Sequence, residues 1–467
     1  MDDKFRHECG IFGVFGEQDA GRWTCVGLGA LQHRGQESAG IAAVAGSQIN
    51  LVRQMGLVAD IFDEPALDRL SGDRAIGHVR YSTSGLSEPN SAQPFVIDHP
   101  GARLAIAHNG NLIDALSLRR SLKQQGILFQ STSDSEIILH LLAHTPGKTL
   151  TDRAITGLSQ LRGAYSLLAV DQNSMIAVRD PWGFRPLVIG KKQDAWVFSS
   201  ETCALSELGA AFIREVQPGE VVTVDATGQS SRTLGDPVRH HQCVFELVYF
   251  ARPDSIVFGE SVVAARKAMG AALARTKPVP QADIVIPVPD SGVFAAIGYA
   301  HETRIPYEMG LMRSHHVRRT FIEPTSSNRT HGVHQKLTVN QEVVSNRRVI
   351  VVDDSLVRGN TAKYMIGLLR RAGAKTVHVR IASPPVQWPC YFGIDTPDRN
   401  ELLAAIQSVN NIGDFLGADS LEYLDADALH RSIQMGATRR KYCDACFTGA
   451  YPSDVNPNGP RRTSQVG

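Results

Sequence analysis

A change of pattern near the middle of the 467-residue chain most constrains the fold. Up to about residue 240, short apolar runs bounded by Gly, Asn and Asp predict mostly antiparallel strands, interrupted by helices at 112–126 and 135–144. From about residue 246, apolar strands alternate with helices, which is typical of a doubly wound parallel sheet. We therefore expect an α+β layered domain followed by an α/β domain with a mostly parallel sheet.

Composition excludes several classes of protein. The 48 Lys and Arg nearly balance the 47 Asp and Glu, which argues against a general nucleic-acid binder, although local Arg clusters could bind a small phosphate. No apolar run approaches the roughly 20 residues of a membrane helix. The charged start lacks the apolar core of a secretory signal, so we expect a cytoplasmic protein. The 7 cysteines indicate catalytic, metal-binding or core thiols rather than disulfides.

Cys9 begins the first predicted strand and is the candidate nucleophile. A thiol at a chain terminus can lose its proton to the free α-amine, whose pKa is about 7.7–8.0. That chemistry requires the removal of residues 1–8, which we therefore interpret as a propeptide. Taken alone, Cys9 is better explained as an ordinary cysteine at the start of a buried strand.

Four further residues reverse that preference and give Cys9 a substrate. Arg80 ends a predicted strand with a cation suited to an α-carboxylate, and Asp134 precedes a predicted helix with an acid suited to an α-amine. Asn109 and Gly110 lie in a predicted turn, where an amide and a backbone N–H can face one oxygen, as in an oxyanion hole. Each residue also has an ordinary explanation, as a surface cation, a helix cap or a turn former. Together they predict hydrolysis of the glutamine amide.

Five short motifs in this half carry a family resemblance. They are Cys-Gly-Ile-Phe-Gly at 9–13, Leu-Gln-His-Arg-Gly-Gln-Glu-Ser at 31–38, Gly-His-Val-Arg-Tyr-Ser-Thr at 77–83, His-Asn-Gly-Asn at 108–111 and Ser-Asp-Ser-Glu at 133–136. The set resembles the N-terminal-nucleophile glutamine amidotransferases. The resemblance implies Cys9 as the nucleophile, Arg80 and Asp134 as holders of the glutamine backbone groups, and Asn109 with Gly110 as the oxyanion hole.

Residues 348–361 combine an apolar strand, two adjacent acids, a loop of small and hydroxyl residues, and a helix. Free N–H groups at the helix start and the Thr361 hydroxyl suit a phosphate. Asp353 and Asp354 could hold ribose hydroxyls and, directly or through water, a Mg²⁺ ion that bridges to pyrophosphate. The ordinary alternative is an acid pair that only caps the following helix.

This segment resembles the signature of type I phosphoribosyltransferases, which use phosphoribosyl pyrophosphate. Residues 287–292 look like the turn of that fold that receives pyrophosphate or metal, with Ser291 as the contributor, although Gly292 stands where relatives often have Ser or Thr. The basic segment at 313–322 suggests an anion-binding loop or an ordinary solvated one. Arg319, Thr320 and Lys336 match the family there, whereas the start of the segment does not. The resemblance implies substrate contacts from Asp353, Asp354, Ser355, Arg358, Gly359 and Thr361.

Cys443 and Cys446 form a Cys-x-x-Cys pair near the end of the chain. Alone, the pair could be redox-active, half of a zinc site or incidental. With Cys243 and Cys390 it supplies four thiolates, and spacing does not choose between zinc and an iron–sulfur cluster. We interpret the two cysteines at 25 and 203 as core or surface thiols.

A cysteine-first glutaminase followed by a phosphoribosyl motif resembles the amidophosphoribosyltransferase family over residues 9–452. The resemblance implies the first committed step of de novo purine (IMP) biosynthesis, in which glutamine, phosphoribosyl pyrophosphate and water give 5-phosphoribosylamine, glutamate and pyrophosphate. The contexts of the four cysteines are similar to a branch that is made as a precursor and carries a structural [4Fe–4S] cluster. In that branch the cluster would lie on Cys243, Cys390, Cys443 and Cys446.

The resemblance sets further expectations. The fold is a four-layer α+β N-terminal-nucleophile glutaminase domain at 9–240 and an α/β type I phosphoribosyltransferase domain at 241–452, with a flexible tail at 453–467. Ser291, Asp353 and Asp354 would hold Mg²⁺, and an apolar tunnel would carry ammonia between the sites. We also expect a homotetramer inhibited by purine nucleotides, without nucleic-acid or membrane partners.

Two rival functions remain to be weighed. Another cysteine-first amidotransferase, such as a hexosamine- or asparagine-forming enzyme, would not need the phosphoribosyl motif at 349–361. A sensor of phosphoribosyl pyrophosphate or of an iron–sulfur cluster, without turnover, would not need the glutaminase residues.

Overall fold

The computed structural model of the protein describes residues 9–81, 89–99, 102–235, 240–313, 337–394, 396, 398–433 and 442–452. The predicted propeptide at 1–8 and the predicted tail at 453–467 lie outside these residues, as do Arg319, Thr320 and Lys336. Within the described ranges, none of the helices is long and apolar enough to cross a membrane.

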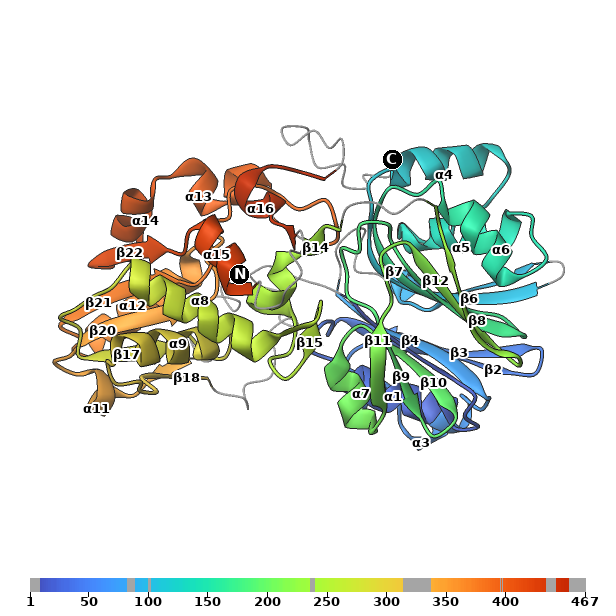
Figure 1. The fold of residues 1–467 in the computed structure, drawn as a ribbon, viewed down its shortest axis with the longest axis horizontal. Coiled ribbons are helices and arrows are strands. Elements are labelled where there is room, and N and C mark those ends of the chain that lie inside the picture. The colour runs from blue at the N-terminus through green and yellow to red at the C-terminus, as the bar shows by residue number, and fades with distance from the viewer. Residues whose placement is uncertain are drawn as a thin grey trace.

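The first half of the chain builds two antiparallel sheets (Figure 1). The seven-stranded sheet has the order β11 (Ala211–Glu215), β9 (Val188–Lys192), β10 (Ala195–Ser199), β1 (Gly10–Phe15), β4 (Arg74–Arg80), β2 (Ser38–Ala45) and β3 (Gln48–Met55). The six-stranded sheet has the order β13 (Gly228–Thr233), β12 (Glu220–Asp225), β8 (Ser174–Arg179), β7 (Gly163–Val170), β6 (Ala102–Leu112) and β5 (Phe95–His99).

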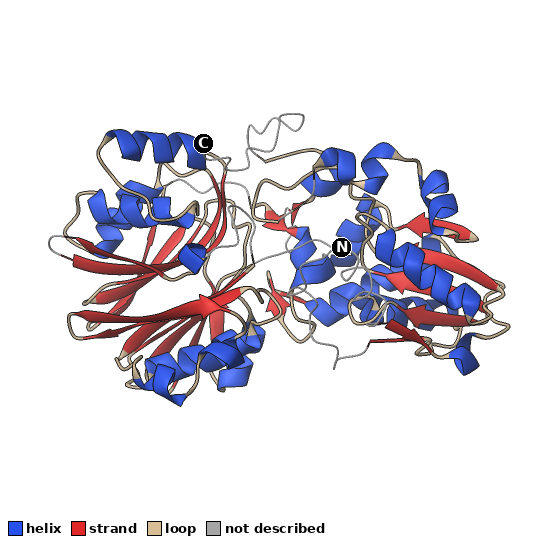
Figure 2. Cartoon of the chain, turned by 180° about the vertical axis from the view of Figure 1, so that it is seen from behind, coloured by secondary structure: helices blue, strands red, loops and turns tan. Residues whose placement is uncertain are grey.

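The two sheets pack face to face, with helices on their outer faces (Figure 2). Successive side chains of a strand point to opposite faces, so Ile11 of β1 enters the core between the sheets while Phe12 packs beneath the outer helices. Helices α1 (Ala20–Ala30) and α7 (Thr202–Leu208) cover the first sheet. Helices α4 (Ala115–Gln124), α5 (Ser135–His144) and α6 (Leu150–Leu158) cover the second. The result is the predicted four-layer arrangement.

Helix α1 shows where the prediction of only two helices in this half was wrong. The glycines of this segment lower its intrinsic helix propensity, so its sequence does not predict a helix. A Cβ atom at Gly27 would lie 2.4–2.5 Å from ring atoms of Phe12. The glycine therefore allows the helix to approach the sheet closely, and packing outweighs propensity.

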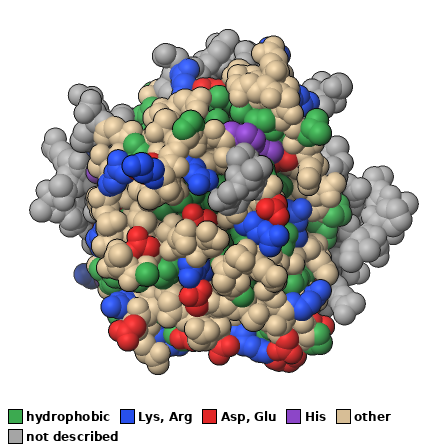
Figure 3. All heavy atoms as spheres, turned by 90° about the vertical axis from the view of Figure 1, so that its right-hand side faces the viewer, with side chains coloured by type: hydrophobic (Ala, Val, Ile, Leu, Met, Phe, Trp, Pro, Cys, Tyr) green, Lys and Arg blue, Asp and Glu red, His purple; other side chains and the backbone are tan. Residues whose placement is uncertain are grey.

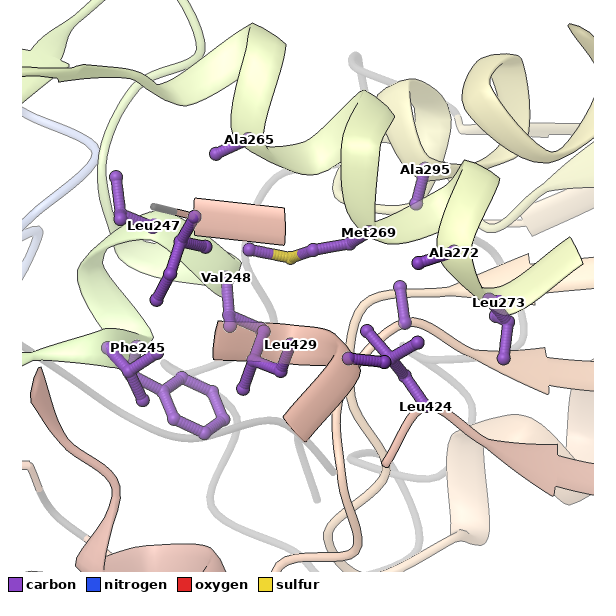
Figure 4. Packing of buried hydrophobic residues seen from close by; sticks show 14 of the residues in the cluster. Phe245, Leu247, Val248, Ala265, Met269, Ala272, Leu273, Ala295, Leu424 and Leu429 are labelled. Atoms are coloured by element: carbon purple, nitrogen blue, oxygen red, sulfur yellow. The ribbon is translucent and has the colours of Figure 1, made fainter. Parts of the chain in front are cut away.

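The second half builds a parallel sheet in the order β17 (Ile284–Pro287), β20 (Arg348–Asp353), β21 (Thr376–Ile381) and β22 (Ser420–Tyr423). Val349 and Ile350 enter the cores on opposite faces of this sheet. One core contains α8 (Val262–Thr276), α9 (Val293–Thr303) and α15 (Ala426–Ile433), and Figure 4 shows Met269 of α8 close to Leu429 of α15. The other contains α12 (Asn360–Arg371) and α14 (Val409–Leu416). The predicted alternation of strands and helices is confirmed.

Short elements complete the described fold. They are α2 (Val58–Ile61), α3 (Glu64–Asp68), α11 (Gln341–Val344), α13 (Leu403–Ile406), α16 (Ala445–Thr448), the helical turns η1 (Pro89–Ser91), η2 (Glu246–Phe250) and η4 (Arg399–Glu401), and the two-stranded ladders β14 (Gln242–Cys243) with β23 (Tyr442–Cys443), β15 (Ile256–Val257) with β16 (Glu260–Ser261) and β18 (Leu311–Arg313) with β19 (Leu337–Val339). On the outer face of the first half, basic and acidic side chains are interspersed (Figure 3), in keeping with the formal net charge of +1.

Buried ion pairs join the two halves. The Arg34 guanidinium donates to Glu201 Oε1 at 2.6 Å and to both carboxylate oxygens of Glu246 at 2.9 and 3.0 Å, and all three side chains are fully buried. Arg185 also contacts Glu246 Oε1 at 3.4 Å. Since Arg34 follows α1 and Glu246 begins η2, these pairs hold the start of the second half against the first.

We expect Glu246→Gln to lower the free energy of unfolding by about 3–5 kcal/mol, because two buried guanidinium groups would lose their shared carboxylate. The midpoint of thermal unfolding measures the effect. Glu64→Gln is the matched control, since it breaks an exposed pair with Arg22 and should leave the midpoint unchanged. Equal midpoints for the two variants would contradict a structural role for Glu246.

Candidate active sites

Cys9 lies directly before β1, at the end of the strand that pairs with β4. The Cys9 side chain is buried, and its thiol faces the Tyr81 carbonyl oxygen at 3.9 Å. The carbonyl oxygen of Cys9 accepts a hydrogen bond from Arg34 Nε at 3.0 Å. Burial raises the pKa of the Cys9 thiol to about 11, although the nearby Arg80 cation lowers it. The thiol is therefore protonated at neutral pH and needs a base.

Arg80 and Asp134 both act electrostatically on this thiol, Arg80 lowering its pKa and Asp134 raising it after the larger effect of burial. Arg80 ends β4 and is only 4% exposed, so its interpretation as a surface cation is wrong. Asp134 is the N-cap residue of α5, but its side chain makes no capping hydrogen bond, and its Oδ2 accepts from the Leu112 backbone N–H at 2.8 Å. Both groups are thus near enough to act on the Cys9 thiol, and their role in holding glutamine stays a prediction.

Asn109 and Gly110 do not form a turn, so that prediction was wrong. They lie inside β6, because β7 continues to pair with this strand as far as Leu112. A Cβ atom at Gly110 would lie 1.9 Å from the Ala164 carbonyl oxygen, so the close approach of β7 demands glycine. Within the described residues, the buried Nδ2 of Asn109 has no hydrogen-bond acceptor. An unpaired buried donor is costly and suits a group that binds a substrate oxygen.

Gln93 supports this strand and was missed by the sequence reasoning. The pairing of β5 with β6 begins at Phe95 and Ile106, so His108 lies beyond it. Gln93 replaces the missing strand, because its Oε1 accepts from the His108 N–H at 2.8 Å and its Nε2 donates to the His108 carbonyl oxygen at 3.3 Å. His78 Nε2 donates to the same carbonyl at 3.1 Å. The only signal in the sequence is a polar residue shortly before a strand.

We expect Gln93→Leu to lower the rate of glutamine hydrolysis by about 10- to 100-fold, because unpaired His108 groups would let Asn109 shift. Steady-state assays of glutamate release measure this. Gln160→Leu is the control, since Gln160 bonds only within its own turn in the described structure. A Gln93→Leu protein with the parental rate would exclude a supporting role.

The acid pair lies where β20 ends. Asp353, Asp354 and Ser355 are buried, the Asp354 N–H donates to Asp353 Oδ1 at 2.9 Å, and the Ser355 hydroxyl donates to Asp354 Oδ1. Gly359, not either acid, is the N-cap residue of α12, so the alternative of a capping acid pair is wrong. Two buried carboxylates at a strand end are the arrangement expected for binding a cation or hydroxyl groups.

Three other predicted contacts follow in the same loop. Gly359 has φ +82°, and a Cβ atom there would lie 2.7 Å from Leu403 Cδ2, so glycine is needed for both reasons. Thr361 lies in the first turn of α12 and is partly exposed. Arg358 Nη2 contacts Glu401 Oε2 at 2.9 Å, so a substrate phosphate would have to compete with this carboxylate.

The predicted pyrophosphate turn follows β17, beside the end of β20. Pro287 is the register partner of Val352, and the carboxyl ends of parallel strands form the usual ligand crevice. A Cβ atom at Gly292 would lie 2.4 Å from the Val352 carbonyl oxygen, so Ser or Thr would not fit at this position without a shift of the backbone. Ser291 is partly exposed in this turn, and Asp290 pairs with Arg313 at 3.1 Å.

The four predicted ligand cysteines lie on segments that are far apart in the sequence. Cys243 and Cys443 are register partners in the ladder of β14 and β23, and Cys446 lies in α16. Burial, and then the other thiols, raise the pKa values of Cys443 and Cys446 well above the usual range. Burial raises the pKa of Cys243 to about 11, and Cys390 adds a smaller increase. All seven cysteines are free thiols. In the described part of the chain, no three His, Cys, Asp or Glu side chains are grouped as ligands of one metal ion.

Comparisons with known proteins match one domain in the first half of the chain and, separately, nearly the whole chain. Residues 78–207 match a family model described as a glutamine amidotransferase domain. The chain is 47% identical over 453 residues to amidophosphoribosyltransferase 1, chloroplastic, of Arabidopsis thaliana, covering 97% of this chain and 80% of that protein. It is 43% identical over 456 residues to the amidophosphoribosyltransferase of Bacillus subtilis, covering 96% and 94%. The solved structure of glutamine phosphoribosylpyrophosphate amidotransferase from B. subtilis, complexed with ADP and GMP, superposes with a TM-score of 0.90 at 43% identity, covering 96% of this chain and 98% of that chain.

Proposed function

The chain belongs to the amidophosphoribosyltransferase family, and from that premise we propose how its own residues carry out the reaction. The protein forms 5-phosphoribosylamine from glutamine and phosphoribosyl pyrophosphate, the first step of purine biosynthesis. It combines a glutaminase fold of the N-terminal-nucleophile class with a type I phosphoribosyltransferase fold, as predicted. The comparisons lend no support to the hexosamine-forming, asparagine-forming or sensor alternatives.

The glutaminase site is assigned to Cys9. The observation that carries this proposal is the position of its buried thiol near both a cation, Arg80, and an anion, Asp134. Arg80 suits the α-carboxylate of glutamine and Asp134 its α-ammonium group, which places the side-chain amide at the thiol. The Cys9 thiolate attacks the amide carbon, and the oxyanion receives hydrogen bonds from Asn109 Nδ2 and the Gly110 N–H. The proton taken from the thiol by the α-amine passes to the amide nitrogen, which leaves as ammonia, and water then hydrolyses the thioester to glutamate.

The thiol needs a base because burial raises its pKa to about 11. The α-amine of Cys9 is that base in our proposal, with a usual pKa of about 7.7–8.0. It exists only after residues 1–8 have been removed, so we propose that this segment is a propeptide.

The phosphoribosyl site is assigned to the crevice between β17 and β20. Asp353 and Asp354 hold the ribose hydroxyls, and the loop from Ser355 to Thr361, including Arg358 and Gly359, receives the 5-phosphate at the start of α12. Mg²⁺ binds proteins through one or two carboxylates plus substrate phosphates, so the buried pair Asp353 and Asp354 fits it, with Ser291 on the facing turn. The ion would neutralise the leaving pyrophosphate. Ammonia attacks C1 of the ribose as pyrophosphate departs.

Ammonia must pass between the sites without being protonated. We expect an apolar tunnel that forms when phosphoribosyl pyrophosphate binds. The buried ion pairs of Arg34 with Glu246 hold the two halves of the chain together where the second half begins.

The four cysteines are assigned to a structural [4Fe–4S] cluster. Cys243, Cys443 and Cys446 are buried or half-buried, and the thiols of Cys243 and Cys390 lie close enough to Cys443 and Cys446 to raise the pKa of both. They are not grouped as ligands of one ion in the described structure. The choice of a [4Fe–4S] cluster over zinc rests on the resemblance of the four cysteine contexts to the iron–sulfur branch of the family.

The remaining expectations complete the proposal. We propose domain limits at 9–240 and 241–452, a homotetramer, inhibition by purine nucleotides and a cytoplasmic location. The location needs its own test, because several relatives are named chloroplastic.

We expect anaerobically purified protein to begin at Cys9 and to contain about four irons per chain. Intact mass and metal analysis measure both at once. Fully active protein that retains residues 1–8 would contradict the terminal-amine mechanism. Zinc in place of iron would contradict the cluster and leave the glutaminase assignment intact.

A further inference from the structure

A turn from the second half of the chain contacts β6, the strand that contains the proposed oxyanion-hole residues Asn109 and Gly110. Asn111 Nδ2, in β6, donates to the Tyr391 carbonyl oxygen at 2.9 Å. A Cβ atom at Gly393 would lie 3.1 Å from the carbonyl carbon of Gly110 and 3.2 Å from its Cα. The turn Tyr391–Gly393 therefore packs directly on the glycine assigned to the oxyanion hole.

The same turn is anchored to the first half by Phe392. The Arg185 guanidinium donates to the Phe392 carbonyl oxygen through Nη2 at 2.8 Å and Nε at 3.1 Å, and Arg185 is fully buried. The Phe392 ring stacks on Phe184 with centroids 4.2 Å apart and 14° between the ring planes. Charged and aromatic contacts thus limit how far the turn can move from β6.

The other end of the turn is fixed within the second half. The Cys390 N–H donates to Thr396 Oγ1 at 2.7 Å, and the Phe392 N–H faces Cys390 Sγ at 3.3 Å. The turn thus connects the segment around Cys390 to strand β6.

We propose that the turn Tyr391–Gly393 positions the oxyanion hole of the glutaminase site, which makes its residues positioning residues for glutamine hydrolysis. The inference rests on the proposed role of Asn109 and Gly110. A catalytic donor must be held to within about 0.5 Å, and this turn supports β6 in addition to Gln93 and β7. Gly393 carries no side chain because a methyl group would press on the Gly110 backbone.

The test compares two glycine substitutions in the mature protein. Gly393→Ala adds a methyl group against Gly110 at a φ of +102°. Gly417→Ala is the matched control, since its φ is +74° and its new methyl group would meet nothing within 4 Å. We expect Gly393→Ala to lower glutamine-dependent kcat by about 10-fold, with an unchanged KM for glutamine. We expect no comparable loss in Gly417→Ala.

Two readouts separate positioning from general damage. Ammonia-dependent synthesis should be parental in Gly393→Ala, because it needs only the second site. Alkylation of Cys9 by iodoacetamide should also keep its rate, because that reaction uses no oxyanion hole. Parallel loss of all three activities would overturn the proposal, since it would indicate a purely structural role.

A second variant avoids any backbone strain. Asn111→Ala removes the bond to the Tyr391 carbonyl and should also lower kcat by several-fold without changing KM. Asn109→Ala serves as the reference for the oxyanion hole, with an expected loss of about 100-fold or more. If Asn109→Ala has no effect, the proposed function of that residue fails. If Asn109→Ala is impaired while Gly393→Ala and Asn111→Ala are parental, only the positioning role fails.

Discussion

Cys9→Ala should abolish glutamine-dependent formation of phosphoribosylamine, by about 10⁴-fold or more, and leave the ammonia-dependent reaction unchanged. The first reaction needs a nucleophile at the amide carbon, whereas the second uses only the crevice between β17 and β20. Pyrophosphate release with each nitrogen source measures both. Cys25→Ala is the control, because Cys25 only packs against the helix-side core of the first sheet and should retain both activities.

The pH dependence of the glutaminase reaction follows from the same site. Burial raises the pKa of the Cys9 thiol to about 11, so the thiol itself stays protonated throughout the neutral range. The rate should instead rise with pH as the α-amine loses its proton, at about 7.7–8.0, and fall below that range because the ammonium form is no base. Mature protein in which the α-amine of Cys9 is chemically blocked should not show this increase in rate with pH. Full activity with the amine blocked would exclude the mechanism.

The second large effect is expected at the acid pair. Asp353→Asn should lower phosphoribosyl transfer by about 100- to 1,000-fold with either glutamine or ammonia, because one of two carboxylates near the proposed Mg²⁺ would lose its charge. Uncoupled glutamine hydrolysis should persist, since Cys9 and its neighbours are untouched. This is the opposite of the outcome expected for Cys9→Ala, so the two variants together separate the sites.

Asp283→Asn is the matched control for that experiment. Asp283 lies just before β17, beside Arg348 at the start of β20, and pairs with its guanidinium at 2.8 Å. It is therefore at the opposite end of the same sheet from Asp353 and should leave both activities unchanged. Equal losses in Asp283→Asn and Asp353→Asn would indicate damage to the sheet and contradict a binding role for Asp353.

Local patterns were sufficient where a single segment carries its own periodicity. The helix predicted at 135–144 is α5, and the strand, acid pair and helix predicted at 348–361 are β20, Asp353 with Asp354, and α12. In such segments, burial of one face follows directly from the spacing of apolar residues. The fold class followed from the same patterns, because alternation of strands and helices distinguishes parallel from antiparallel sheets.

Patterns failed where a neighbour overrides local preference. Helix α1 forms despite its glycines because Gly27 packs on Phe12, and Asn109 and Gly110 lie in a strand because β7 continues alongside them. Both errors have one cause. Glycine and asparagine favour turns in isolation, but a partner strand or sheet at close range supplies contacts that outweigh this preference.

The sequence by itself determined which chemical groups the protein has: a thiol, a cation, an acid and an amide in the first half, and an acid pair before a glycine and threonine loop in the second. These depend on residue type and local order. Only the tertiary structure decided what supports them. Gln93 completes the edge of β6, and Tyr391–Gly393 packs on Gly110 from a segment far along the chain. Such support depends on which backbones become neighbours after folding, and no local pattern of residues encodes that.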